Sequence, residues 1–204
     1  MRQLTQDDIL DLGDYAASRA DRRGKIIALK LRRRVALGPY AMFMFENWDT
    51  MWYQVHEMLY IEQGVQMGRP IDPKSVSAQL RDELAAYNPL IPNGAELVAT
   101  VMFEIENPDR RDTVLDNLGG VEHSFSLKVG GQDIAGVPET DTERTNEAGR
   151  ASSVQFLHFP FTADQRDLFR AHEAEITLVC AHPGYAHMAG LNDELRAELA
   201  RDFD

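Results

Sequence analysis

In the first third of the chain, hydrophobic residues recur every three or four positions, a spacing typical of helices with one buried face. A helix is predicted to begin near Thr5, because its hydroxyl can accept a free backbone amide and the acids that follow suit the positive end of a helix. A second helical run, from Arg19 to Arg33, mixes aliphatic and basic residues, and Gly24 is a point where it can bend or break. The predicted helices cover residues 5–16, 19–33, 49–63, 76–87, 109–118, 162–172 and 192–202.

After Arg34 the hydrophobic period changes to two, which is typical of strands. A connection is predicted between residues 64 and 73, and an exposed loop over the polar stretch 140–152. The predicted strands cover residues 35–37, 40–45, 97–105, 124–129, 154–161 and 175–181. This order predicts an α+β fold, with a mainly antiparallel sheet and helices packed on one side of it, in a single domain that spans residues 1–204.

Length and composition narrow the class of protein. The length of 204 residues is typical of one globular domain. Cys180 is the only cysteine, which excludes an intramolecular disulfide and a site built from several cysteines of this chain, and which indicates a reducing compartment. No apolar run has the length of a signal peptide or approaches the roughly 20 residues that span a bilayer. We therefore expect a soluble, cytoplasmic protein without a membrane partner.

Charge is distributed unevenly along the chain. The net charge of -12 argues against a nucleic-acid partner, because a phosphate backbone would meet a repulsive field. The first 34 residues nevertheless carry nine basic and five acidic residues, whereas the rest carries 12 basic and 28 acidic ones. A basic helical segment, residues 5–34, is therefore predicted to precede an acidic body.

Arg32, Arg33 and Arg34 are the candidate anion-binding residues of this basic segment. A guanidinium fork matches the two oxygens of a phosphate, of a carboxylated ligand or of an acidic partner surface. The alternative is a solvated helix end that is stabilised by its cations. Three successive side chains on a helix point in three directions, so one arginine rather than all three is expected to contact the ligand.

Glu57 is the candidate acid or base of the helix predicted at 49–63. Tyr53 shares a stripe with Glu57 at a separation of four residues, and His56 lies on a neighbouring stripe. A carboxylate among aromatic side chains can have a raised pKa and exchange protons with a substrate. The alternative is a solvated acid beside core aromatics.

The segment from Cys180 to His187 is the candidate metal site. If its Pro-Gly pair reverses the chain, Cys180 lies opposite His187 and His182 opposite Tyr185, with all four side chains on one face. Imidazole and sulfur could then hold a divalent metal ion, or an imidazolium could activate the thiol. The alternative is an inert core cysteine at the end of a strand.

A stiff loop begins at Tyr87 and Asn88, where prolines 89 and 92 restrict the backbone. The two side chains offer polar groups from a rigid support, so the loop could form a pocket wall or a docking surface. The alternative is a plain connection between a helix and a strand.

Several phrases of the sequence are familiar in combination. They are Ile27-Ala-Leu-Lys30 with Arg32-Arg33-Arg34-Val35, Phe45-Glu-Asn47, Tyr53-Gln54 with Glu57-Met58-Leu59, Tyr87-Asn-Pro-Leu-Ile-Pro92 with Glu96-Leu97 and Ala99-Thr100, and His182-Pro-x-Tyr185-x-His187. In this order they resemble the bacterial domain-of-unknown-function family numbered 3501, over nearly the whole chain. The resemblance implies an accessory role in a redox or peroxide-defence system, beside a rubrerythrin-like di-iron protein and an iron–sulfur protein of the heterodisulfide-reductase type.

Two hypotheses of different classes follow. In the first, the protein is a noncatalytic partner of redox proteins and docks through its basic N-terminal helix and its proline loop. In the second, it is a small metal- or carboxylate-dependent enzyme with a site near Glu57, His182 and His187, and a divalent metal ion as its cofactor. The first is favoured, because the sequence yields no complete catalytic constellation. The sequence leaves the oligomeric state open.

Overall fold

A computed structural model of the chain describes residues 2–65, 68, 73–140, 144–171 and 174–203. Contacts group the chain into two compact units. The helical unit comprises Met1–Leu31 and Glu46–Pro92, and the sheet unit comprises Arg32–Phe45 and Asn93–Asp204. We describe each unit by itself, and the single domain expected from the sequence stays a prediction.

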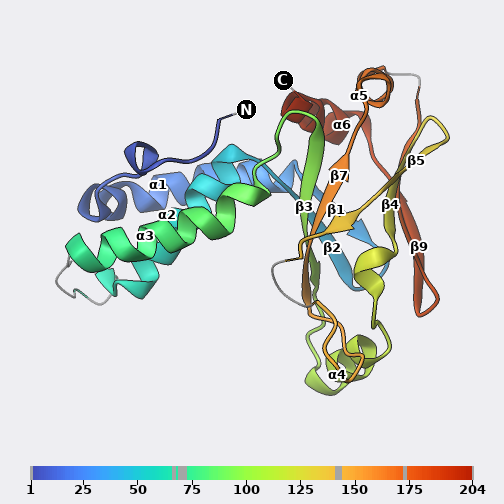
Figure 1. The fold of residues 1–204 in the computed structure, drawn as a ribbon, viewed down its shortest axis with the longest axis horizontal. Coiled ribbons are helices and arrows are strands. Elements are labelled where there is room, and N and C mark those ends of the chain that lie inside the picture. The colour runs from blue at the N-terminus through green and yellow to red at the C-terminus, as the bar shows by residue number, and fades with distance from the viewer. Residues whose placement is uncertain (1, 66–67, 69–72, 141–143, 172–173, 204) are drawn as a thin grey trace. The chain divides into compact units, whose positions relative to one another are not determined.

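The helical unit consists of three α-helices that lie side by side, with α1 against α2 and α2 against α3 (Figure 1). The helices are α1 (Leu12–Leu31), α2 (Trp48–Glu62) and α3 (Pro73–Tyr87), with short 3-10 turns η1 (Gln6–Asp8) and η3 (Asn88–Leu90). None of the helices in the part of the chain that the structure describes is long and apolar enough to cross a membrane.

Local sequence explains where these helices begin. Thr5 caps the short turn η1 rather than a long helix. The backbone amide and the hydroxyl of Thr5 both donate hydrogen bonds to the carboxylate of Asp8. Asn47 caps α2 by accepting a hydrogen bond from the amide of Thr50 at 3.0 Å. Gly24, where the sequence allows a bend or a break, does not interrupt the helix: α1 runs through it, since one glycine lowers helix stability without blocking a backbone hydrogen bond.

The sheet unit contains two antiparallel sheets. The first has the strand order β1 (Arg34–Leu37), β2 (Ala41–Glu46), β3 (Glu96–Phe103), β7 (Val154–Pro160), β6 (Val137–Pro138). The second has the order β5 (Gln132–Ala135), β4 (Phe125–Val129), β8 (Ile176–His182), β9 (Tyr185–Gly190). The hairpin that the sequence predicts around residues 38 and 39 is present as β1 and β2.

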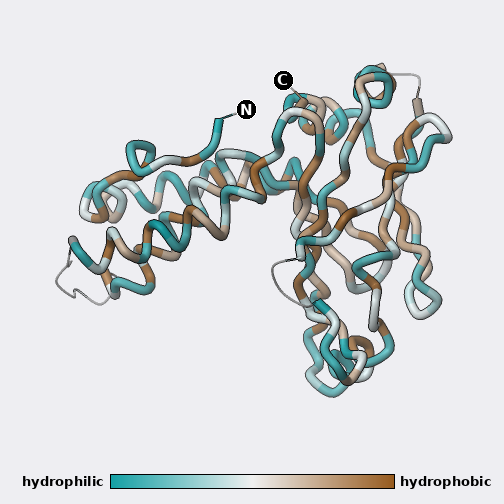
Figure 2. Tube along the Cα trace, viewed as in Figure 1, coloured by the Kyte–Doolittle hydropathy of each residue, from teal (hydrophilic) through white to brown (hydrophobic). Residues whose placement is uncertain are grey.

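The two sheets share one hydrophobic core. Hydrophobic and hydrophilic residues alternate along their strands (Figure 2), and β7 alternates buried with half-buried side chains along most of its length. Phe43 of the first sheet meets Phe125 of the second edge to face, with ring centroids 5.3 Å apart. Alternation thus places one face of each sheet in the core, as the period of two predicts.

Short helices complete the sheet unit. They are α4 (Pro108–Asp116), α5 (Ala163–Arg170) and α6 (Asp193–Leu199), with the 3-10 turns η4 (Val121–His123) and η5 (Ala200–Phe203). Phe169 of α5 and Phe203 of η5 pack with Phe161 in a cluster of three rings. The α+β class is confirmed, and the antiparallel strands divide between two sheets.

Two of the predicted connections lie partly beyond this description. Residues 66–67 and 69–72 of the connection after α2, and residues 141–143 of the loop before β7, lie outside the described residues. The described part of that loop contains an isolated antiparallel bridge between Thr145 and Ala151.

Candidate functional site

Glu57 projects from α2 toward α1 and accepts three hydrogen bonds there. Tyr15 donates its hydroxyl at 2.6 Å, and Arg19 donates Nε and Nη2 at 2.8 and 2.7 Å. Burial opposes ionisation of Glu57, but the bonds from Arg19 and Tyr15 outweigh it and hold the pKa of the carboxyl below its usual value. The aromatic surroundings alone would favour a raised pKa of Glu57. The two hydrogen bonds from Arg19 lower the pKa of Glu57 instead. The carboxylate therefore stays charged and links α2 to α1 through Arg19 and Tyr15.

His56 has no exposed surface and uses both ring nitrogens in contacts with the backbone. Its Nδ1 donates to the Trp52 carbonyl at 2.7 Å, and its Nε2 accepts from the Leu10 amide at 3.1 Å, an arrangement that requires the neutral ring. Burial lowers the pKa of His56 to about 4. The third candidate, Tyr53, has a pKa raised by its own burial and by the charge of Glu57.

The partners of Glu57 were missed at the sequence level. Tyr15 and Arg19 lie four residues apart on α1, as Tyr53 and Glu57 do on α2. This equal spacing is a signal that two helix stripes face each other, although it does not say which stripes pair.

The three candidate arginines pair with carboxylates of the sheet unit, and Arg32 and Arg33 share one of them. Arg33 has no exposed surface: its Nε donates to the Phe45 carbonyl at 2.8 Å, and its other nitrogens pair with Glu198 and Asp202. The side chain of Arg32 is 45% exposed and lies 3.5 Å from Glu198. α1 ends at Leu31, so Arg32 and Arg33 lie just beyond the helix that was predicted to reach Arg33, and Arg34 begins β1.

Arg34 lies 3.8 Å from Glu104 on the same sheet unit. Arg32 and Arg33 therefore share Glu198, whereas Arg34 pairs with Glu104. Arg33 pairs with two buried carboxylates. It therefore stabilises the interior of the sheet unit and is not part of a binding surface.

Asn88 holds the N-terminal segment against the start of the proline loop. Its amide oxygen accepts from the Leu4 amide at 2.8 Å, and its amide nitrogen donates to the Leu4 carbonyl at 3.0 Å. Tyr87 is half-buried, and burial raises the pKa of its phenol. Both polar atoms of the Asn88 amide group therefore bond to the backbone of Leu4, within the helical unit.

The hairpin of β8 and β9 has the register that the sequence predicts. Cys180 lies opposite His187, and His182 lies opposite Tyr185. Cys180 is 1% exposed, and burial raises the pKa of its thiol, which therefore stays protonated at neutral pH. His182 accepts from the Gly184 amide through Nδ1 at 3.1 Å and donates to the Gly119 carbonyl through Nε2 at 3.2 Å.

Tyr185 occupies the centre of this face. Its hydroxyl donates to the Leu37 carbonyl at 2.6 Å and accepts from the amides of Tyr40 and Ala41. The ring of His187 packs against it at a centroid distance of 4.4 Å. Together these contacts join β9 to the β1–β2 hairpin.

The residues proposed for a metal or an active centre are not gathered by these contacts. Glu57 belongs to the helical unit, and His182 and His187 belong to the sheet unit. Among the described residues, no three His, Cys, Asp or Glu side chains are grouped so that they could hold a metal ion. None of these three residues lines the hollow beside α3 or the cavity beside η4.

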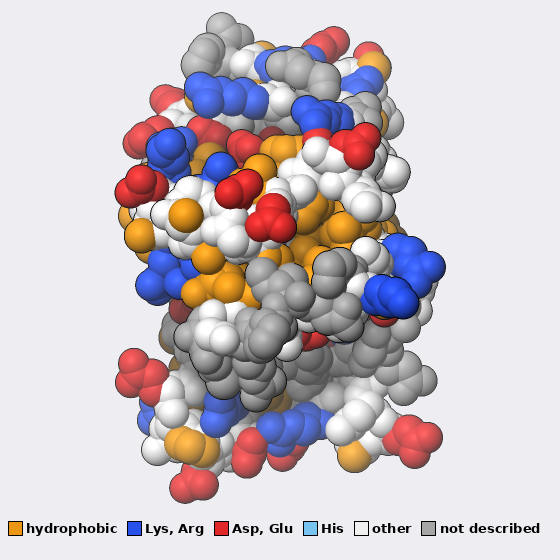
Figure 3. All heavy atoms as spheres, turned by 90° about the vertical axis from the view of Figure 1, so that its left-hand side faces the viewer, with side chains coloured by type: hydrophobic (Ala, Val, Ile, Leu, Met, Phe, Trp, Pro, Cys, Tyr) orange, Lys and Arg blue, Asp and Glu red, His pale blue; other side chains and the backbone are white. Residues whose placement is uncertain are grey.

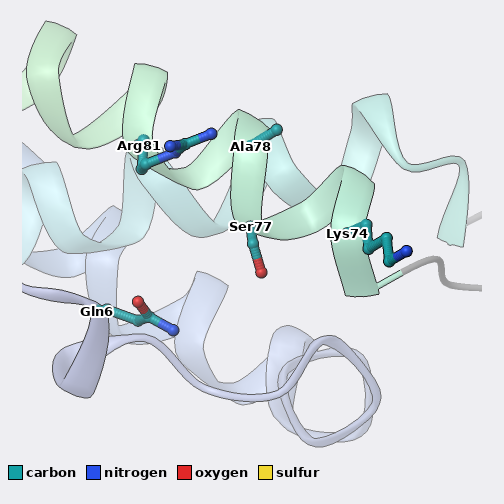
Figure 4. A pocket seen from close by; sticks show the side chains of 5 residues that line it. All are labelled: Gln6, Lys74, Ser77, Ala78 and Arg81. Atoms are coloured by element: carbon teal, nitrogen blue, oxygen red, sulfur yellow. The ribbon is translucent and has the colours of Figure 1, made fainter.

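An open hollow of about 530 Å³ lies between the N-terminal segment and α3 (Figure 4). Lys74, Ser77 and Arg81 line it from α3, and Gln6 lines it from the opposite segment, toward which the Ser77 hydroxyl points. Lysine and arginine seven residues apart share one face of a helix, so the hollow has a basic wall. The spacing of Lys74 and Arg81 can be read from the sequence, but the sequence does not show that the segment around Gln6 lies opposite them.

The outer face of α1 combines exposed apolar and basic side chains. Ile27 is 49% exposed and Leu31 is 64% exposed, one turn apart on the same face. Arg23 is exposed one turn before Ile27, and Lys25 is exposed about 160° around the helix from Ile27; neither forms a salt bridge with the described residues. Figure 3 views the molecule from the left-hand side of Figure 1 and shows hydrophobic side chains exposed among basic and acidic ones on that face.

The fold is that of an α+β protein with a three-helix unit and two antiparallel sheets. The chain belongs to the family described as protein of unknown function (DUF3501), whose model matches residues 3–203. It is similar to a crystal structure from Burkholderia pseudomallei K96243, a novel protein of unknown function, with 34% sequence identity, full coverage of both chains and a TM-score of 0.86. A search among curated proteins found no match.

Proposed function

We propose that this protein is a noncatalytic accessory protein that docks onto a partner protein through the outer face of α1. The partners would be a rubrerythrin-like di-iron protein and an iron–sulfur protein of a bacterial redox or peroxide-defence system. The single observation that carries the proposal is the exposure of Ile27 and Leu31 beside Arg23 on one helix.

The outer face of α1 has the composition of a docking surface. Ala20 and Gly24 continue the stripe of Ile27 and Leu31 toward the N-terminus at helical spacing, and Ala28 adjoins it, so a partner could approach the helix backbone closely. A helix that only covers a core turns polar side chains to solvent, whereas an apolar stripe with a charged rim is typical of interaction sites. The exposed surface of α1 around this stripe contains Asp21 as well as Arg23 and Lys25, and its basic groups favour an acidic partner surface.

The groups that could catalyse a reaction are engaged in holding the fold. Glu57 accepts hydrogen bonds from Arg19 and Tyr15, both nitrogens of His56 are bonded to the backbone, and the thiol of Cys180 is buried. A general acid or base needs a proton that it can exchange with a substrate. These contacts favour the partner hypothesis over the enzyme hypothesis.

Binding to the purified rubrerythrin-like di-iron protein of the same bacterium tests the proposal. The affinity should fall with increasing salt, and the double variant Arg23→Glu with Lys25→Glu should bind at least about tenfold more weakly. Arg110→Glu with Arg111→Glu changes the charge equally on the exposed side of α4 and should leave the affinity unchanged within about twofold.

The apolar part of the surface is tested separately by Leu31→Ser. Loss of a buried leucine at an interface should weaken binding by about tenfold or more while leaving thermal stability nearly unchanged, since Leu31 is 64% exposed in the free chain. Equal loss of affinity in the α4 control, or full affinity of both α1 variants, would show that the partner docks elsewhere.

A further inference from the structure

His158 of β7 lies between two carboxylates in the first sheet. Its neighbours Leu157 and Phe159 belong to the hydrophobic core, so the imidazole points to the opposite face of the strand. There Nδ1 lies 3.0 Å from Oε2 of Glu96 on β3, and Nε2 lies 2.7 Å from Oε1 of Glu139, the residue that follows β6. The side chains of His158, Glu96 and Glu139 are 18%, 12% and 21% exposed, so water screens their charges only in part.

This arrangement requires a proton on each ring nitrogen of His158. An ionised carboxylate only accepts hydrogen bonds, a neutral imidazole has one N–H to donate, and an imidazolium has two. The charged ring therefore satisfies both Glu96 and Glu139, whereas the neutral ring satisfies one of them. The bond to Glu96 raises the pKa of His158, burial opposes that rise, and the bond to Glu139 raises the pKa further.

The other side chains around His158 leave these two carboxylates in control of its charge. Val98 of β3 and Val137 of β6 lie directly opposite His158 and do not titrate. Arg144 opposes protonation, because its guanidinium lies 4.8 Å from the ring centroid of Phe156, two positions before His158 on β7. Two titratable residues of η4 line a cavity of about 310 Å³ together with Glu139 and Arg144; they are Glu122 and His123. The pKa of His158 is nevertheless raised, so the carboxylates outweigh the guanidinium.

The segment that contains Glu139 has few other contacts to hold it on β7. Strand β6 is the edge strand of the first sheet, it is two residues long, and its Pro138 has no amide hydrogen to donate. Val137 is 49% exposed, so its side chain buries little apolar surface. Just beyond the strand, the Glu139 amide donates to the Phe156 carbonyl at 3.1 Å. The contact between Glu139 and His158 is therefore a large part of what holds residues 137–139 in place.

We propose that residues 137–139 form a pH-dependent strap, which is closed on β7 while both ring nitrogens of His158 are protonated and opens when the ring loses a proton. Glu96 keeps the remaining N–H, because β3 is paired with β7 from Glu96 to Met102 and cannot move away. Glu139 then faces an unprotonated nitrogen and leaves it.

The strap is closed below the ordinary pKa of 6.5 and opens as the pH rises through the raised pKa of His158. Opening leaves the backbone edge of β7 free to pair with another strand. This strap is independent of the docking surface on α1.

An NMR titration of the full chain from about pH 6 to about pH 9 tests the proposal. The ring nitrogen shifts of His158 report its protonation. The solvent exchange of the Glu139 amide, taken relative to its intrinsic rate at each pH, reports whether the strap is closed. We expect a doubly protonated ring at about pH 7 and a several-fold loss of amide protection at higher pH, with the same midpoint as the ring titration.

Glu139→Gln separates the strap from general effects of pH. Its amide group can donate to the neutral ring as well as accept from the charged one, so the protection should lose its pH dependence. Glu147→Gln makes the same change of charge at an exposed position and should behave as the wild-type protein does.

Two results in the wild-type protein alone would overturn the proposal, so the test does not depend on the folding of a variant. One is a His158 ring that titrates at or below its ordinary pKa of 6.5. The other is amide protection at Glu139 that stays constant while the ring loses its proton. An equal loss of pH dependence in Glu147→Gln would also overturn it, because the effect would then come from the bulk charge of the protein.

Discussion

Arg33 is a fully buried cation between two buried carboxylates, and that arrangement sets the consequence of replacing it. Arg33→Met keeps much of the side-chain volume but leaves Glu198 and Asp202 without their buried cation, which should lower the free energy of unfolding by about 3–5 kcal/mol. Arg32→Met removes a half-exposed partner of Glu198 and should cost about 1 kcal/mol or less. Urea unfolding measures both, and similar losses in the two variants would contradict the structural role of Arg33.

His56 makes the stability of the helical unit depend on pH. Its pKa is lowered to about 4 in the folded chain from an ordinary value of 6.5, so its contribution is present above pH 6.5 and is lost as the pH falls from 6.5 through 4. The shift corresponds to about 3 kcal/mol. Unfolding at a series of pH values, with an NMR titration of the His56 ring, measures the effect, and a ring that titrates near 6.5 would contradict it.

Helix α1 contains a glycine that the fold does not require. A Cβ atom at Gly24 would meet nothing within 4 Å, and the residue has an ordinary helical backbone. Gly24→Ala should therefore raise the free energy of unfolding by about 0.5–1 kcal/mol, because alanine favours the helix. Thermal and urea unfolding measure the gain. A loss of stability would show that a neighbouring group closes over this face of α1.

Local patterns predicted most of the elements, whereas partners remote in the sequence could not be predicted. The alternating periods located the helices and strands, and the Pro-Gly turn was enough to set the pairing of Cys180 with His187. Arg33 and Asp202 are 169 residues apart, and no spacing rule connects them. For the same reason the bonds from Arg19 to Glu57, which reverse the expected pKa shift, are visible only in the folded chain.

At the scale of the whole molecule, the basic segment of the sequence divides between the two units. Arg32, Arg33 and Arg34 belong to the sheet unit and pair with its acids, while α1 belongs to the helical unit. Counting charges along the sequence predicted one basic segment, residues 5–34. A charge count cannot show which carboxylates of the folded chain lie beside these basic side chains. What remains of that segment as a surface is the exposed part of α1 with Arg23, Lys25, Ile27 and Leu31.

Hydrogen–deuterium exchange of the full chain, alone and with the purified rubrerythrin-like di-iron protein, tests the docking proposal most directly. The account predicts slower exchange in peptides from residues 20–31 of α1 when the partner saturates the chain, and little change in β8 and β9. Slowing confined to the sheet unit, or no slowing anywhere under saturating conditions, would contradict the proposal that α1 carries the docking surface.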